Sequence, residues 1–395
     1  MSTYLVNARL ILSDRVVNGG LLIADGILRK ICLEGMKVPA HDRQIDLEGA
    51  FVSPGFVDLH VHGGGGYDFL DGTTEAFLGA AQAHMRHGTT TLLPTATACS
   101  MEELEQAFSA LRTVKRSGKP LPDMPGMHLE GPFLSPLQAG AIDPAYLLEP
   151  TEENVDQILS MGEKEIARMT FASELPGAIS LCKALRARGI LASVGHSDAE
   201  YSSVLEAVEA GSSLVTHLYS AMSTLRRRNA SRFLGVLESA YLLDELDVEI
   251  IADGCHLPPE LLRLIIKEKP MEKICLITDA MRGAEMPEGS VTRLGSLQNG
   301  RDAIIKDGVA YMPDFSCFAG SVCTTDRCVR TMVKKVGVSL VDAISMMSSN
   351  PCRVLGISDH KGTIAEGMDA DLCVFDDDIQ IQQVWIAGEK VYSAT

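Results

Sequence analysis

The stretch GFVDLHVHGGGG, residues 55–66, ends an apolar run with two histidines and continues into four glycines. Since side chains alternate along a β-strand, His60 and His62 project from the same face. Imidazole is a common ligand of divalent metals, and the glycines keep the following loop thin enough for a small molecule to approach. The stretch therefore predicts a buried strand with a pair of metal ligands at its carboxyl end.

Further apolar runs of this kind recur along the chain, and each is followed by a turn signal. They read TTTLLPT, GMHLEG, RMTFASE, LASVGHS, SLVTHLY, VEIIADG and ICLITDA. Segments with helical periodicity lie between the runs, for example MEELEQAFSALRTVKRSG and AEYSSVLEAVEAG. Strand and helix thus alternate about eight times, which predicts an α/β fold of the parallel (β/α)8 TIM type.

The runs share a second property, because most of them end in a polar side chain. In a barrel of this type the carboxyl ends of the strands form the active-site mouth. The residues expected there are His60, His62, Glu130, His196, His217, Asp253, His256 and Asp279. A single strand histidine is more often a hydrogen-bonded core residue than a ligand, but six polar strand ends reverse that preference. The remaining five histidines are interpreted as surface or structural residues.

Both ends of the chain differ from the middle, because their apolar residues alternate with period two. Residues 1–52 and 359–395 are therefore expected to join in one small β-sandwich domain, with the barrel over 53–358 inserted between them. Residues 284–316, after the eighth run, are expected to form a β-hairpin flap over the barrel mouth.

Composition excludes several classes of function. The net charge of −17 over 395 residues argues against nucleic acid and anionic membrane surfaces, since both require a basic face. The chain starts without a signal-peptide pattern, so a cytoplasmic protein is expected, and the scattered cysteines predict neither a zinc finger nor a disulfide. The segment LRRRNASR, residues 225–232, is the basic exception and is either an anion site or a solvated face.

The expected cluster has the side chains needed for metal-assisted hydrolysis of an amide. Glu130, His196 and His217 match the three protein ligands of a catalytic zinc, and a bridging Glu130 would allow a second ion at the histidine pair. Asp279 is the candidate general base, with a role as a further ligand as the alternative. His256 is the candidate donor to the carbonyl oxygen under attack.

Several of these motifs resemble a known group of enzymes. PGFVDLHVHG, HLEGPFLSP, VGHSDA, VTHLYSAM, IADGCH, ITDAM and GTIAEGMDADLCVFD together resemble the N-acetylglucosamine-6-phosphate deacetylases of the amidohydrolase superfamily. The resemblance covers nearly the whole chain and implies the same barrel with a small β-sandwich. It implies that Glu130, His196 and His217 hold the main metal, with a second ion at His60 and His62.

The resemblance also implies a substrate and its contacts. Asp279 would be the acid and base of the reaction, and His256 would polarise the acetyl carbonyl. The sugar phosphate would lie near Ser220, Ala221 and Arg228. The implied reaction removes the acetyl group of an N-acetylhexosamine 6-phosphate, with one or two divalent ions per chain, zinc in preference to iron or another ion. A homodimer is left open, because no interface can be read from the chain.

Two residues depart from the family pattern, and both lie on the substrate side. Ile142 stands where the family has a histidine, and Ser220 where it has an asparagine. Isoleucine can neither donate nor accept a hydrogen bond, so a deacylase of a different N-acyl compound is the alternative function. A catalytically silent sugar-binding protein is a third hypothesis, and the candidate base Asp279 argues against it.

Overall fold

The computed structural model describes residues 1–394, and a closed parallel barrel forms its centre. The strand order is β6-β9-β10-β11-β12-β13-β16-β17. The bounds are β6 (Phe56–Val61), β9 (Thr89–Thr97), β10 (Met127–Glu130), β11 (Ile166–Phe171), β12 (Leu191–Val194), β13 (Leu214–Val215), β16 (Asp247–Ile251) and β17 (Ile274–Ile277). The Asp279 N–H donates to the His60 carbonyl (2.9 Å), which closes the ring. The predicted (β/α)8 fold is confirmed, with one strand in each of the eight runs.

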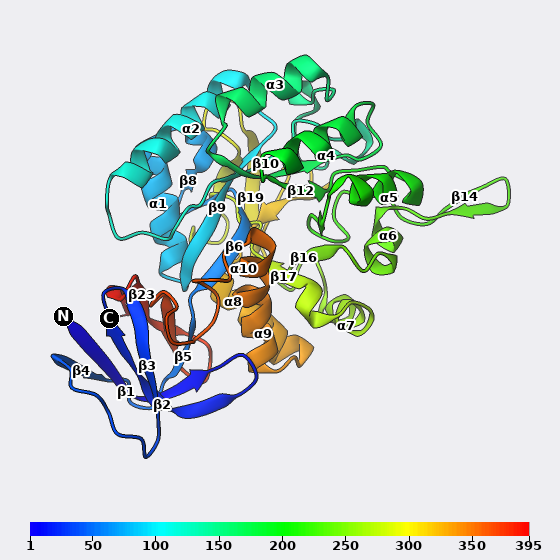
Figure 1. Ribbon diagram of the computed structural model, residues 1–395. Coiled ribbons are helices and arrows are strands. Elements are labelled where there is room, and N and C mark those ends of the chain that lie inside the picture. Colours follow the sequence, from blue (N-terminus) through cyan, green and yellow to red (C-terminus); the bar gives the residue numbers. More distant parts are fainter. Residues whose placement is uncertain (395) are drawn as a thin grey trace.

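Helices surround the barrel and cover its outer face (Figure 1). They are α1 (Thr74–Met85), α2 (Met101–Arg116), α3 (Glu152–Met161), α4 (Ala178–Ala187), α5 (Tyr201–Ala210), α6 (Val236–Leu242), α7 (Pro259–Glu268), α8 (Thr325–Thr331), α9 (Leu340–Met347) and α10 (Ser349–Leu355). Helix α2 shows why they start and stop where they do. Ser100 and Glu103 form a capping box at its first turn, and Lys115 and Arg116 lie in its last turn. None of the described helices is both long and apolar enough to cross a bilayer.

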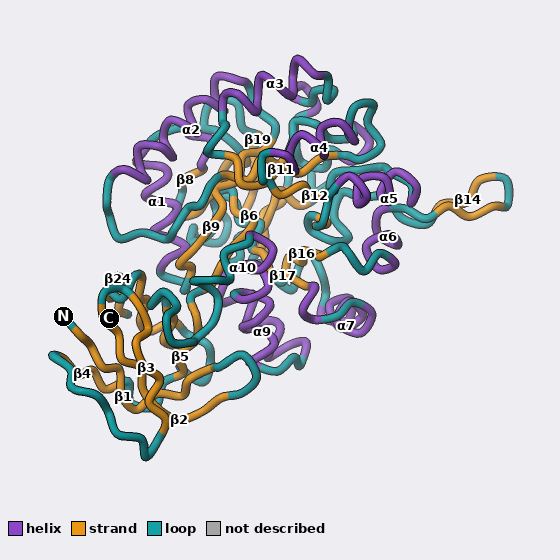
Figure 2. The backbone as a smooth tube through the Cα atoms, in the orientation of Figure 1, coloured by secondary structure: helices purple, strands orange, loops and turns teal. Residues whose placement is uncertain are grey.

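The two ends of the chain lie side by side and share one eight-stranded sheet (Figure 2). Its strands are β1 (Ser2–Ile11), β2 (Val16–Ala24), β3 (Ile27–Leu33), β4 (Arg43–Asp46), β5 (Phe51–Pro54), β22 (Leu372–Phe375), β23 (Ile381–Ile386) and β24 (Glu389–Ser393). The join is antiparallel, and Leu372 pairs with Pro54. The buried Trp385 packs in an apolar cluster with side chains from both ends. The expected β domain from both termini is confirmed, whereas its exact boundaries remain a prediction.

The excursion after the eighth barrel strand is larger than the expected hairpin. It is a four-stranded antiparallel sheet of β18 (Val291–Leu294), β19 (Arg301–Lys306), β20 (Val309–Tyr311) and β21 (Phe318–Ser321). The last strand extends the flap to Ser321, whose N–H donates to the Asp279 carbonyl (2.9 Å). The flap is therefore attached directly to the end of the barrel strand that leads to Asp279.

The remaining short elements lie in the loops. They are β7 (Gly63–Gly64), β8 (Tyr67–Asp68), β14 (Arg226–Arg228), β15 (Ser231–Phe233) and the single turns η1 (Phe69–Asp71), η2 (Pro136–Gln138), η3 (Pro144–Tyr146), η4 (Met271–Lys273) and η5 (Met332–Val336). Strands β14 and β15 form a hairpin that extends away from the body of the molecule (Figure 1).

Candidate functional site

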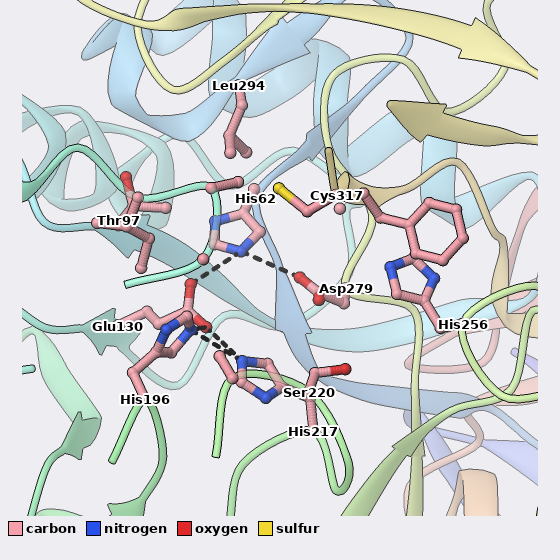
Figure 3. Close-up of a pocket in the computed structure, with 16 residues that line it drawn as sticks. His62, Thr97, Glu130, His196, His217, Ser220, His256, Asp279, Leu294 and Cys317 are labelled. Atoms are coloured by element: carbon pink, nitrogen blue, oxygen red, sulfur yellow. Dashed lines mark hydrogen bonds and ion pairs between the residues drawn. The ribbon is translucent and has the colours of Figure 1, made fainter. Parts of the chain in front are cut away.

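A cavity of about 240 Å³ opens at the carboxyl ends of the barrel strands (Figure 3). Six of the expected polar residues line it, namely His62, Glu130, His196, His217, His256 and Asp279. They come from different strands or from the loops that follow them. The structure thus brings together side chains from distant parts of the chain, as the barrel geometry predicts.

Glu130, His196 and His217 form the first group of candidate ligands, which we call the glutamate group. The Nε2 atoms of His196 and His217 lie 3.1 and 3.0 Å from Glu130 Oε1 and 3.0 Å from each other. His196 Nδ1 lies 2.8 Å from the Gln138 carbonyl, which only accepts, so Nδ1 carries the proton of the neutral ring. The lone pair of Nε2 then faces other acceptors, an arrangement that a divalent cation fits.

His60, His62 and Asp279 form the second group, which we call the histidine-pair group. Asp279 Oδ1 lies 3.4 Å from His60 Nε2 and 3.2 Å from His62 Nε2, and these two nitrogens are 3.1 Å apart. The Glu130 carboxylate lies 3.3 Å from each of the same nitrogens, through different oxygens. Glu130 therefore stands between the two groups, where a carboxylate can bridge two ions.

The charges of the site favour cations. Burial lowers the pKa of His60 and His62, but Glu130 and Asp279 outweigh it and raise these values to about 9 and about 10. Burial raises the pKa of Asp279, but the same histidines hold it at about 2. Protons and metal ions compete for such ligands, and two ionised carboxylates favour whichever cation is bound.

Three of the candidate ligands adopt a backbone conformation that is rare for residues with a side chain. The φ angles of His196, His217 and Asp279 are 46°, 29° and 47°. The left-handed region costs free energy for any residue other than glycine, and such residues cluster at functional sites. This left-handed backbone conformation directs each of the three side chains toward the cavity, just after a barrel strand ends.

His256 lies on the opposite wall of the cavity from the glutamate group (Figure 3). Its Nδ1 is 2.7 Å from Asp253 Oδ2, and the Asp253 carboxylate also accepts the backbone N–H of His256 (2.9 Å). The ring packs against Phe318 of the flap at a centroid distance of 4.5 Å. These contacts fix the ring and leave Nε2 as the nitrogen available to a substrate, and they give Asp253 a positioning role.

The expected substrate residues fall into two sets. Ser220 and Ala221 line the cavity, and so does Ile142, which is 5% exposed. Arg228 is not among the lining residues, because it lies in the projecting β14–β15 hairpin. Its guanidinium pairs with Glu200 and lies over the Phe233 ring, 4.0 Å from the centroid. Within one chain, the structure does not bring Arg228 to the cavity.

The flap supplies part of the cavity wall, and the residues that form this part were not predicted from the sequence. Leu294, Cys317 and Phe318 line the cavity, as does Thr97 at the end of β9. The flap was expected over the mouth, but its short strands carry no motif that identifies which residues face inward.

The chain is similar to known proteins over most of its length. Residues 51–391 match the model of the amidohydrolase family. The N-acetylglucosamine-6-phosphate deacetylase of Danio rerio is 32% identical over 99% of this chain and 96% of its own length. The N-acetylgalactosamine-6-phosphate deacetylase of Escherichia coli O157:H7 is 29% identical, over 98% of this chain and 99% of its own.

A solved structure is similar over the same extent. A point mutant of N-acetyl-D-glucosamine-6-phosphate deacetylase from Mycobacterium smegmatis, in complex with N-acetyl-D-glucosamine-6-phosphate, superimposes with a TM-score of 0.89. It is 32% identical, and the match covers 99% of this chain and 100% of that one.

Proposed function

Because this chain belongs to the amidohydrolase family, and within it to the N-acetylglucosamine-6-phosphate deacetylases, we propose that it hydrolyses the acetamido group of an N-acetylhexosamine 6-phosphate. The products are acetate and the amino sugar phosphate, and N-acetylglucosamine 6-phosphate is the expected main substrate. One observation supports this most strongly. The glutamate group, His256, and His62 and Asp279 of the histidine-pair group line one cavity, and the buried His60 lies directly behind them.

Each of these groups has a role in the proposed reaction. The two ligand groups would hold a divalent ion, which would supply the Lewis acidity needed to polarise the amide carbonyl and lower the pKa of a water molecule. Asp279 accepts a proton from the attacking water and returns it to the departing nitrogen. His256, in its protonated form, donates from Nε2 to the carbonyl oxygen, where negative charge develops. Imidazole nitrogens and carboxylate oxygens are ligands that zinc accepts, so zinc is the proposed metal, and the place of Glu130 between the two groups would allow two ions.

Acetate release by the purified, metal-analysed protein tests the proposed substrate. The panel contains N-acetylglucosamine 6-phosphate, its galactosamine epimer and both unphosphorylated sugars. We expect the highest kcat/KM on N-acetylglucosamine 6-phosphate, with the unphosphorylated sugars well below it. Lack of release from every member by the metal-loaded protein would contradict the proposal.

A different N-acyl substrate is the second candidate, and Ile142 is the observation that favours it. The side chain lines the cavity and packs in a small apolar cluster with Ala98 and Leu134. The side chain of residue 142 therefore offers no hydrogen bond to a sugar hydroxyl. If the sugar panel fails, other N-acyl compounds are the next substrates to test.

We propose that Arg228 binds the phosphate of the substrate in a neighbouring subunit of a homodimer. Two observations support this assignment. The β14–β15 hairpin projects from the body, and the Arg228 side chain at its end is 55% exposed, so a second chain can reach it. A guanidinium suits phosphate because it can donate two parallel hydrogen bonds.

Replacing Arg228 by alanine should raise KM for N-acetylglucosamine 6-phosphate by about 10–100-fold. This corresponds to the roughly 1.5–3 kcal/mol of a charge-assisted hydrogen bond. KM for N-acetylglucosamine should change little, and Arg227→Ala, at the neighbouring exposed arginine, is the matched control. Equal effects on both sugars would exclude Arg228 as the phosphate ligand.

Mixed dimers decide which chain supplies Arg228. Arg228→Ala and Asp279→Asn chains are unfolded and refolded together at equal concentration. Supply by the neighbour should restore about a quarter of the wild-type activity at low substrate, since half of the dimers then contain one complete site. No restoration would mean that Arg228 does not act across the dimer.

A cytoplasmic location is part of the proposal, because phosphorylated sugars are retained inside cells by their charge.

A further inference from the structure

A charged pair lies inside the barrel, beneath the candidate ligands. Arg168 of β11 and Glu249 of β16 are both fully buried. Arg168 Nη2 donates to Glu249 Oε2 (2.8 Å) and to Thr216 Oγ1 (2.9 Å), and Nη1 donates to Glu249 Oε1 and to the Leu59 carbonyl (3.1 Å). The guanidinium is therefore held by several barrel strands, and it holds the carboxylate by both oxygens.

Glu249 faces the histidine-pair group from below. Its Oε2 lies 3.7 Å from His60 Nδ1 and 3.4 Å from the backbone nitrogen of His217. His60 Nδ1 is buried and has no hydrogen-bond partner at ordinary distance among the described residues. His60 Nε2, on the other side of the ring, faces His62, Glu130 and Asp279. The ring thus stands between the candidate metal position and a buried carboxylate.

This arrangement has a consequence for the tautomer of His60. A histidine that ligates a metal through Nε2 carries its proton on Nδ1, and that proton needs an acceptor. The Glu249 carboxylate is aimed at Nδ1 from slightly beyond hydrogen-bond distance. Hydrogen bonds of this kind often tighten when a site binds its ligand.

We infer that Glu249 is a positioning residue for His60, fixing its ring and tautomer for metal binding, and that Arg168 holds Glu249 in place. The inference rests on the proposed metal-dependent function. It concerns mainly the histidine-pair group, because in the glutamate group Glu249 meets only the backbone nitrogen of His217 (3.4 Å) and His196 has its own outer partner in the Gln138 carbonyl (2.8 Å). Glu249 therefore determines how tightly the second ion binds.

Two double variants isolate the contact. Arg168→Met/Glu249→Gln and Arg168→Met/Glu249→Met both remove the buried ion pair, and glutamine and methionine have similar volumes. Replacement of a buried ion pair by residues of similar volume is often tolerated, so both variants are expected to fold. They differ in one respect, since only glutamine retains an oxygen that can accept the His60 Nδ1–H.

The readout is zinc binding to the metal-free protein, measured by titration against a competing chelator. We expect the wild type to bind two ions and the glutamine variant to bind the second within a few-fold of it. The methionine variant should bind the second ion about 10–100-fold more weakly, with the first little changed. Equal second-ion affinity in the two variants would overturn the inference, and so would a wild type that binds only one ion.

A second measurement on the unmodified protein covers the case in which a variant fails to fold. Nitrogen-15 NMR of the zinc-loaded, histidine-labelled protein reports the His60 tautomer, with His60→Gln for assignment. A proton on Nδ1 is expected, whereas an unprotonated Nδ1 would refute the role of Glu249. Neither measurement uses turnover, so an inactive wild type that shows the expected zinc difference would leave this inference standing and reject the proposed substrate.

Discussion

Replacement of Asp279 by asparagine should lower kcat for the best substrate by at least about 10³-fold. General acid–base catalysis by a positioned side chain typically contributes about 10²–10⁴-fold, and Asp279 serves both proton transfers in the proposed reaction. Asparagine has nearly the same shape, but it cannot take a proton from water. The His60 and His62 rings hold the pKa of Asp279 at about 2, so the wild-type side chain is an ionised base at neutral pH.

Metal content separates this role from ligation. Asp279 also belongs to the histidine-pair group, so the variant is expected to bind its second ion more weakly, whereas the glutamate group should keep the first. Asp58→Asn is a matched control, because Asp58 is buried in the adjacent strand, accepts from Thr278 Oγ1 (2.5 Å) and the His60 N–H (3.3 Å), and does not line the cavity. We expect its kcat to stay within about tenfold of the wild type. If kcat of Asp279→Asn also stays within about tenfold of the wild type, Asp279 is not the base.

Replacement of Glu130 by glutamine should abolish activity by removing the metal. Glu130 contacts both candidate groups, so its loss should cost more than the roughly 10–100-fold that follows loss of an outer hydrogen bond to a ligand. The glutamine amide can donate to the Nε2 atoms that now face Glu130, which satisfies them without an ion. We therefore expect a folded, metal-poor protein whose melting temperature is equal to or above that of the metal-free wild type.

Elemental analysis and melting curves check this result. Glu103→Gln is the matched control, because Glu103 is buried at the start of α2 and bonds Ser100 and Ser296 outside the ligand groups. That variant should retain metal and activity. In the wild type, a chelator should remove activity and added zinc should restore it. A Glu130→Gln protein with unchanged metal content would refute the bridging role.

The barrel and its polar strand ends could be predicted from sequence because both depend on local patterns. An apolar run that ends in His, Glu or Asp specifies a buried strand and the side chain at its tip, as at Glu130 and Asp279. Parallel strands then bring those tips to one mouth without further information. The two ligand groups follow from that rule, although their distances do not.

The features that could not be predicted depend on contacts between distant residues. Arg168 and Glu249 are 81 positions apart, and each is a charged residue within an otherwise apolar strand, a pattern that does not reveal its partner. Strand β21, with the sequence FAGS, has little intrinsic strand preference and forms through its pairing with β20. The basic segment 225–232 indicates a local positive charge, but the sequence does not reveal which molecule Arg228 binds.

The left-handed backbone at His196, His217 and Asp279 affects how such an enzyme can lose its activity by mutation. Each such residue costs about 1–3 kcal/mol, against a typical net stability of about 5–15 kcal/mol for a whole domain. Glycine at these positions would relieve the strain and remove the ligand in a single substitution. Loss of catalysis is therefore the direction in which the fold gains stability. Without selection for turnover, such a barrel would accumulate substitutions at these positions and become a more stable binding protein that holds no metal. The present chain differs from such a protein at these three side chains.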